Sequence, residues 1–141
     1  MTNFKKVFLD TAPFVYFLDN DPNFAEQTEQ IISELIRDEK YIASSVISAA
    51  EYLVHPYRSG NEDKIKSFWK FLDDLYIVLS PINKDIVIEA AKIRAEYRHI
   101  KTADALQLAA AICGGCDLFL TNDRQLRQFD KIKCMTVDEW S

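Results

Sequence analysis

Four acidic residues, Asp10, Glu51, Asp104 and Asp123, carry the chemistry that this sequence most clearly indicates. Asp10 and Asp123 each follow a short apolar run, so both occupy the carboxyl ends of predicted buried strands. In an open parallel sheet, ligands bind at that edge. We therefore expect folding to bring these distant side chains to one crevice.

The other two acids lie on predicted helices. Glu51 falls on a helix that Ser44 or Ser45 would cap, about two turns beyond a short strand, so its side chain can lean over the same sheet edge. Asp104 lies in the first turn after a predicted cap at Thr102, where the helix dipole favours a negative charge. Single acids at such places are common for structural reasons, so the prediction depends on all four converging.

Converging carboxylates predict a bound cation. Two of them about 4 Å apart repel by roughly 4 kcal/mol at an effective dielectric constant near 20, and a positive charge must offset that repulsion. Oxygen ligands without a matching set of His or Cys indicate Mg²⁺ or Mn²⁺ rather than zinc. One ion or a pair of ions would activate water and stabilise the leaving oxygen in the hydrolysis of a phosphate ester.

The bulk composition predicts a single domain over residues 1–141. Hydrophobic residues make up 48% of the chain, enough for one core. The net charge of −5 excludes a protein that holds nucleic acid by bulk positive charge. No apolar run approaches the roughly 18–20 residues of a membrane span, and the first residues do not form a signal peptide. We therefore expect a cytoplasmic protein without a membrane segment.

Apolar runs and helical periodicity alternate along the chain. Strands are predicted at 7–9, 41–43, 76–79, 117–121 and 134–137. Helices are predicted at 11–19, 22–38, 45–53, 62–75, 83–98 and from 102 onward, and 55–61 is predicted as a loop. This alternation indicates an α/β fold with a parallel sheet and right-handed crossovers.

The three cysteines do not predict a disulfide framework, because their number is odd. Cys113 and Cys116 match the CxxC pattern, but they close a predicted helix and precede a strand, whereas a redox pair normally opens a helix. Gly114 is therefore predicted as a helix cap in the left-handed conformation, and the cysteines as structural.

Basic residues near the predicted site have two interpretations. Arg94 and Arg98 lie four apart on one helix, and Lys101 follows them. They would either line a phosphate-binding groove or complement the dipole at a solvated helix end. Arg124, next to Asp123, is a further candidate for binding phosphate or for pairing with a site carboxylate.

Two other groups have structural interpretations that we favour. His99 is predicted to be a surface or capping residue rather than a phosphate donor. A group of aromatic residues is spaced for a helical core or a subunit interface, although stacking on bases is the alternative. These residues are Phe14, Tyr16, Phe17, Trp69 and Phe71.

The segments that carry the acids resemble a known family. Residues 9–16, 48–53, 101–109 and 120–123 are similar, in order and spacing, to the successive motifs of PIN-domain ribonucleases, especially the VapC toxins of toxin–antitoxin operons. Each motif alone is weak, but four in the family's order are specific. The match runs from Asp10 to the last predicted strand.

The resemblance implies a site, a fold and partners. Asp10, Glu51 and Asp104 would match the three acids of a Mg²⁺/Mn²⁺ site, Asp123 the more variable fourth, and Thr121 the polar residue two positions before it. The implied fold is a three-layer PIN-like one, with a parallel sheet of four or five strands between helices. The implied activity is cleavage of RNA by a homodimer, silenced in the toxin members by a small cognate antitoxin.

Other functions stay open on the sequence. The chain would also suit a PIN nuclease of RNA processing, or a catalytically inert PIN-like or receiver-like binding module. Phosphoryl transfer through an aspartyl intermediate at Asp10 is a further enzyme class. Against it, Ala12 stands where haloacid-dehalogenase-like enzymes place a second Asp.

Overall fold

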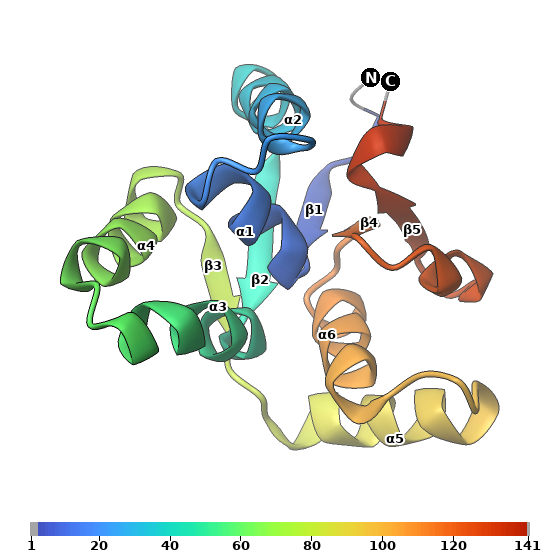
Figure 1. Cartoon of the computed structure of the whole chain (residues 1–141). Helices are drawn as coiled ribbons and strands as arrows, with labels where there is room; N and C mark the ends of the chain where they lie inside the picture. Colours follow the sequence, from blue (N-terminus) through green and yellow to red (C-terminus); the bar gives the residue numbers. More distant parts are fainter. Residues whose placement is uncertain (1–2, 141) are drawn as a thin grey trace.

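A five-stranded parallel sheet forms the centre of the molecule (Figure 1), in a computed structural model that describes residues 3–140. The strands are β1 (Lys6–Leu9), β2 (Tyr41–Ser45), β3 (Val78–Ser80), β4 (Leu118–Thr121) and β5 (Lys133–Thr136). Their order across the sheet is β3-β2-β1-β4-β5. The predicted α/β fold with a parallel sheet is confirmed.

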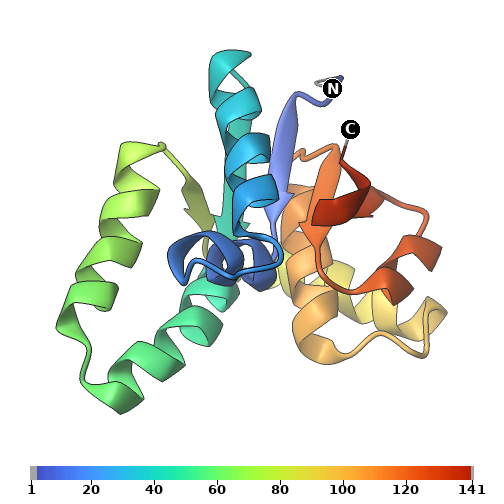
Figure 2. The same ribbon diagram turned by 45° about the horizontal axis from the view of Figure 1, so that its top comes forward.

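Helices connect the strands and cover both faces of the sheet (Figures 1 and 2). The α-helices are α1 (Thr11–Leu18), α2 (Ala25–Arg37), α3 (Val46–Ser59), α4 (Glu62–Asp74), α5 (Lys84–Glu96) and α6 (Thr102–Cys113). Two short 3₁₀ helices follow the last strands, η1 (Arg124–Gln128) after β4 and η2 (Val137–Glu139) after β5. No helix within residues 3–140 is both long and apolar enough to cross a membrane.

Side chains alternate between the two faces along each strand, which produces the three layers. In β1, Val7 and Leu9 join the core beneath α1 to α4, whereas Phe8 joins the core beneath α5 and α6. Phe8 stacks on Phe119 of β4 with ring centroids 5.3 Å apart. Burying one such side chain stabilises the fold by roughly 1.5–3 kcal/mol.

The strand order places a topological switch point beside β1. The chain builds β1, β2 and β3 in one direction across the sheet and then returns to add β4 on the other side of β1. Asp10 follows β1 and Asp123 follows β4, so the two acids flank the point where the order reverses. Ligand sites of open α/β sheets lie at such points.

Polar caps fix where several helices begin. The Ser45 hydroxyl accepts a hydrogen bond from Ile47 N–H at 3.1 Å, so Ser45, one of the two predicted candidates, caps α3. Asn83 caps α5 in the same way. α6 begins at Thr102, which makes Lys101 its cap instead of Thr102, without a side-chain hydrogen bond. Asp104 still lies in the first turn.

The loop predicted at 55–61 is wrong, because α3 continues to Ser59 with Pro56 inside it. Proline removes one backbone donor from the helix, and here its buried ring packs inward. The helix ends at Gly60, whose φ of +63° is the left-handed conformation that glycine adopts without strain.

Two smaller boundaries also differ from the prediction. α2 begins at Ala25 rather than near residue 22, because the Asp21 carboxylate accepts from the backbone N–H groups of Asn23 and Phe24 and holds a turn there. β3 begins only at Val78, after a turn in which Tyr76 has a φ of +53°.

The helix cap predicted at Gly114 is also wrong in its geometry. Gly114 has a φ of −82°, and the left-handed residue is Gly115 with a φ of +74°. All three cysteines are free thiols, and burial raises the pKa of Cys116 to about 11 and of Cys134 to about 12. These thiols are therefore protonated at neutral pH, in agreement with the structural interpretation.

Candidate active site

Folding brings the four acids to one open pocket of about 590 Å³ at the carboxyl ends of β1 and β4. Each acid comes from a different element, as the sequence predicts. The pocket is lined by Asp10, Thr11, Ala12, Glu51, Asp104, Thr121, Asn122 and Asp123.

Asp10 lies at the centre of this pocket and is held by three hydrogen bonds. Its carboxylate caps α1 by accepting from Thr11 N–H at 2.9 Å. It also accepts from the Gln107 amide at 3.2 Å and from the Thr121 hydroxyl at 2.8 Å. Burial raises the pKa of Asp10 although these donors lower it, and the charge of Glu51 adds to the rise. The carboxylate is therefore fixed in orientation.

Glu51 reaches the pocket from the exposed side of α3. The hydroxyl of Thr11, the first residue of α1, donates to Glu51 Oε1 at 2.5 Å. This contact links α1 to α3 across the mouth of the pocket. It gives Glu51 a preferred orientation that its exposed position alone would not provide.

Asp104 shows that the acids act on one another electrostatically. Its pKa is raised from 3.8 to about 6, first by burial and then by the charges of Asp10, Asp123 and Glu51. The positive charge of Lys101, the cap of α6, lowers the pKa of Asp104 and so opposes these effects. The predicted convergence of all four acids is therefore visible in the charge environment of one of them.

Asp123 and Thr121 form a turn that faces Asp10. The buried Thr121 hydroxyl accepts from Asp123 N–H at 3.1 Å while it donates to Asp10. The Asp123 carboxylate in turn caps η1 by accepting from Gln125 N–H at 2.9 Å. Thr121 thus orients Asp10 and the backbone of Asp123 together.

Three polar residues that line or support the pocket are not among the predicted site residues. Thr11 and Asn122 line the pocket, and Gln107, which is 1% exposed, contacts Asp10 from below. A signal for Gln107 was present, since it is the one amide among the Ala and Leu residues of α6 and lies three positions after Asp104. Residues three apart share a helix face.

The donor chemistry of the pocket fits a hard divalent cation. It offers carboxylate oxygens, the ligands that Mg²⁺ and Mn²⁺ prefer, and Asp104 is destabilised in its charged form by its acidic neighbours. Within residues 3–140, no three His, Cys, Asp or Glu side chains already form a metal-ligand cluster. Glu51 and Asp123 are exposed at the pocket, so an ion from solvent can reach their carboxylates.

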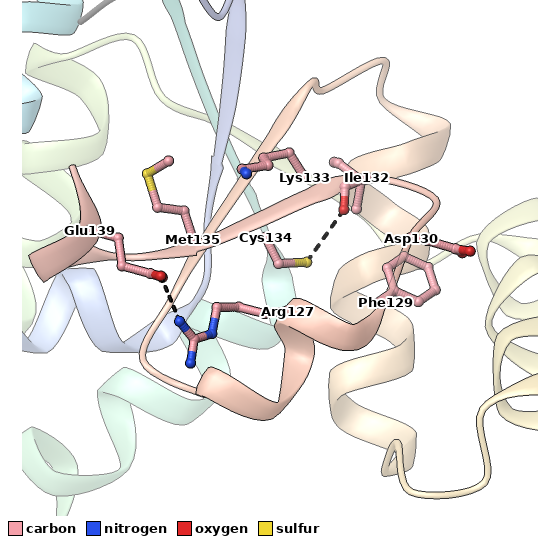
Figure 3. Close-up of a pocket in the computed structure, with 8 residues that line it drawn as sticks. All are labelled: Arg127, Phe129, Asp130, Ile132, Lys133, Cys134, Met135 and Glu139. Carbon is pink, nitrogen blue, oxygen red and sulfur yellow. Dashed lines mark hydrogen bonds and ion pairs between the residues drawn. The ribbon is translucent and has the colours of Figure 1, made fainter. Parts of the chain in front are cut away.

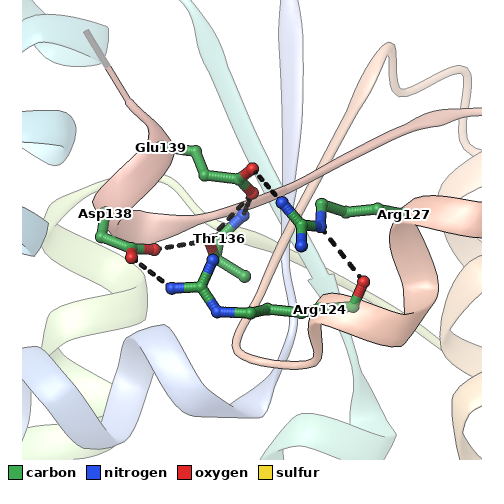
Figure 4. A network of polar contacts seen from close by, with 5 residues as sticks. All are labelled: Arg124, Arg127, Thr136, Asp138 and Glu139. Carbon is green, nitrogen blue, oxygen red and sulfur yellow. Dashed lines mark hydrogen bonds and ion pairs between the residues drawn. The ribbon is translucent and has the colours of Figure 1, made fainter.

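The arginines after β4 form ion pairs with acids of η2 (Figure 4). Arg124 forms an ion pair with Asp138, so the predicted pairing of Arg124 with a site carboxylate is wrong. Arg127 pairs with Glu139 at 2.7 Å. Together these pairs join η1, which Asp123 caps, to η2.

The basic residues before α6 lie at the end of α5. Arg94 Nε donates to the carbonyl oxygen of Ile100 at 3.3 Å, a contact typical of a helix end. Arg98 and His99 are exposed in the following turn, and none of the three lines the acidic pocket. The role of Arg94, Arg98 and Lys101 in phosphate binding stays a prediction.

Most of the predicted aromatic group belongs to the core. Phe14 and Tyr16 are buried, and Phe17 and Phe71 pack against the same cluster. Trp69 is 44% exposed on α4. Stacking on bases from the four core residues would require the core to open.

A second pocket of about 550 Å³ lies along β5 and η1 (Figure 3). Arg127 in this pocket is already paired with Glu139, and the Cys134 thiol donates to the carbonyl oxygen of Ile132 at 3.6 Å. None of the four acids lines it. The four predicted acids therefore line the acidic pocket and not this one.

Solved structures with this fold are chains of bacterial protein complexes. The chain is 18% identical to one in VapBC2 from Rickettsia felis, bound to a DNA fragment from their promoter, with a TM-score of 0.78 and coverage of 93% of this chain and 98% of that one. DNA-bound VapBC from Salmonella typhimurium gives 19% identity, a TM-score of 0.74 and coverage of 94% and 98%. FitAcB from Neisseria gonorrhoeae gives 19% identity, a TM-score of 0.73, and coverage of 95% of this chain and 99% of that one.

Comparison of sequences gives the family. No curated protein matches the sequence. The family model of the PIN domain matches residues 7–132, which include all four acids and every strand except Lys6 of β1 and the last strand, β5. The structural likenesses, at their low identities, show the same fold independently. This chain therefore belongs to the PIN domain family.

Proposed function

We propose that this protein is a Mg²⁺- or Mn²⁺-dependent endoribonuclease that acts as the toxin of a toxin–antitoxin pair. The observation that carries the proposal is the single pocket into which β1, α3, α6 and the β4–η1 turn each contribute one carboxylate. A pocket so acidic repels a phosphodiester by itself. A divalent cation would turn it into a site that attracts one.

In the proposed reaction, Asp10, Glu51, Asp104 and Asp123 hold the ion, which when bound activates water and stabilises the leaving oxygen. Asp10 presents a carboxylate whose orientation is fixed by three donors, and Thr11 holds Glu51. The Thr121 hydroxyl is engaged with Asp10 and so serves to orient it rather than to attack. No nucleophilic side chain is required.

The proposed partners are RNA as substrate, a small cognate antitoxin and a second copy of this chain. The antitoxin is supported by the similar structures, which include VapBC and FitAB assemblies and a toxin–antitoxin complex from Klebsiella pneumoniae. We place the protein in the cytoplasm, where such a substrate and such a partner occur.

Cleavage of RNA in Mn²⁺ by the purified protein and by Asp10→Asn tests the nuclease. We expect Asp10→Asn to fold, as judged by circular dichroism, and to lose cleavage. The matched control is Asp73→Asn, an exposed acid at the end of α4 outside the pocket, which should cleave like wild type. Cleavage retained by Asp10→Asn, after contamination is excluded, would refute the assignment.

Calorimetric titration with Mn²⁺ separates the nuclease from an inert binding module. A nuclease of this kind binds Mn²⁺ in wild type and loses that binding in Asp10→Asn. Partner binding without any Mn²⁺ binding would favour the inert module instead.

The toxin role has its own test. Expression of the protein should arrest growth, and co-expression of a small protein encoded beside it should relieve the arrest. Growth that continues with active nuclease present would instead favour a PIN nuclease of RNA processing.

A further inference from the structure

Four buried polar side chains lie directly behind the acidic pocket. Ser44, Ser45 and Ser48 are fully buried and Gln107 is 1% exposed. They come from β2, α3 and α6, three elements that meet beneath the end of β1. Buried polar groups are stable only when their hydrogen bonds are satisfied, so the pattern of these bonds is informative.

The orientation of the Gln107 carboxamide is determined by its neighbours. A carboxylate that binds a metal ion is ionised and only accepts hydrogen bonds, so for Asp10 to serve as a ligand the Gln107 nitrogen must face it, as it does at 3.2 Å. The Gln107 oxygen then faces the Ser45 hydroxyl, which donates to it. Ser45 is free to donate because its oxygen already accepts from Ile47 N–H. A flipped amide would place two acceptors together at Asp10.

A second chain of hydrogen bonds runs from the same nitrogen to the backbone before Asp10. Gln107 Nε2 donates to the Ser48 hydroxyl at 2.7 Å, and the Ser48 and Ser44 hydroxyls are 2.9 Å apart. Ser44 donates to the carbonyl oxygen of Leu9 at 2.6 Å. Because Leu9 immediately precedes Asp10, the amide supports both the side chain and the preceding peptide of this acid.

Gln107 also shares a helix with another pocket acid. It follows Asp104 by three residues on α6, so the helix that presents Asp104 to the pocket also carries the side chain that supports Asp10. Any shift of α6 would therefore move both acids together. Ser48 lies on α3, the helix that carries Glu51, so this helix is connected to the same buried hydrogen-bond network.

We propose that Gln107 is a positioning residue that fixes the Asp10 carboxylate and thereby sets the affinity of the pocket for its divalent cation. This inference rests on the proposed function, since it assumes that the pocket binds an ion. Partners that orient metal ligands typically change metal affinity or activity by about 10–100-fold when they are removed. Gln107 does not line the pocket, so it acts through Asp10 and not on the substrate.

The test is Mn²⁺ titration of Gln107→Met by calorimetry, starting from metal-free protein. Met keeps the length and most of the volume but removes both donors and the acceptor. We expect the dissociation constant for Mn²⁺ to rise by about tenfold or more. An unchanged dissociation constant in the folded variant overturns the inference.

A matched control separates positioning from a merely structural role. Thr28→Val removes another fully buried hydroxyl, one that donates to the Phe24 carbonyl oxygen at 2.7 Å on α2, away from the pocket. This variant should lose thermal stability while its Mn²⁺ affinity stays that of wild type. If it weakens Mn²⁺ binding as much as Gln107→Met does, the effect is general and the inference fails.

Gln107→Leu decides the matter if Gln107→Met does not fold. It removes the same amide, and with it the hydrogen bonds to Asp10, Ser48 and Ser45, but leaves a shorter apolar side chain. The expected rise in the Mn²⁺ dissociation constant is again about tenfold or more. An unchanged dissociation constant overturns the inference.

The outcomes separate this inference from the proposed function. Wild-type protein that binds Mn²⁺ but does not cleave RNA contradicts the proposed nuclease activity only. The Mn²⁺ affinities of the variants then still test the role of Gln107. Wild type and variants that bind Mn²⁺ equally contradict the role of Gln107 only. Wild type that binds no Mn²⁺ contradicts both.

Discussion

Asp104→Asn should stabilise the metal-free protein at alkaline pH, although it removes a residue of the proposed active site. The pKa of Asp104 is raised from 3.8 to about 6. Ionisation of Asp104 therefore destabilises the folded state by about 3 kcal/mol, because a pKa difference of one corresponds to about 1.4 kcal/mol. Asp104 is only half-buried, and solvent screening reduces this to about 1–2 kcal/mol.

The direction of the effect follows from the raised pKa. Above pH 6 the carboxyl is ionised in both folded and unfolded chains, and the folded state is penalised in full. The penalty shrinks as the pH falls through 6, because the folded carboxyl binds a proton first. It vanishes below about pH 4, where both states are protonated. The neutral Asn should therefore help at pH 8 and make little difference at pH 4.

Thermal unfolding followed by circular dichroism in EDTA measures the effect. At pH 8, Asp104→Asn should unfold about 3–6 °C above wild type, since about 1 kcal/mol corresponds to about 3 °C for a chain of this size. In excess Mn²⁺ the order should reverse, because a ligand that binds only the folded state stabilises wild type.

Asp85→Asn is the matched control, because Asp85 lies in the first turn of α5 as Asp104 does in α6, but outside the pocket. An exposed acid there stabilises the helix dipole, so this variant should lose about 0.3–1 kcal/mol. If Asp104→Asn unfolds below wild type at pH 8 in EDTA, burial and the neighbouring acids do not raise the pKa of Asp104 as we infer.

Three further predictions concern the pocket and one turn. Mn²⁺ binding should weaken as the pH falls below 6, where the Asp104 carboxyl gains the proton that competes with the ion; titrations at pH 7.5 and 5 with equal affinity would contradict this. Thr11→Val removes the hydroxyl that holds Glu51 and should weaken Mn²⁺ binding by about tenfold in calorimetry, with the melting temperature nearly unchanged. Gly60→Ala should destabilise the protein by about 1 kcal/mol in urea unfolding, because the backbone at φ +63° is strained with a side chain although there is space for one; a neutral result would contradict the assigned helix end.

The layout of the fold and of the four acids could be predicted because it depends on local patterns. The strands that flank the pocket are continuous apolar runs, Asp10 and Asp123 follow them, and Asp104 lies in the first turn of a helix, where short-range capping rules apply. The edge of a parallel sheet then brings them together. The family resemblance added the order of the motifs.

The errors and omissions have a different origin. The loop prediction at 55–61 follows from the general tendency of proline to break helices, whereas the place of Pro56 inside α3 depends on the core against which it packs. The roles of Gln107 and Thr11 depend on partners 97 and 40 residues away, so the position of Gln107 three residues after Asp104 makes it a candidate but does not reveal its role. Likewise the ion pair of Arg124 with Asp138 could not be predicted, because it depends on how η1 and η2 lie beside each other in the fold.

The contact between Asp10 and Thr121 spans 111 residues, and β1 pairs with β4 over a similar separation. A growing polypeptide on the ribosome therefore lacks one wall of the pocket until β4 has been synthesised and has left the exit tunnel. Under the proposed function, such a chain would not cleave RNA before that point. A cognate antitoxin would have this interval in which to bind it.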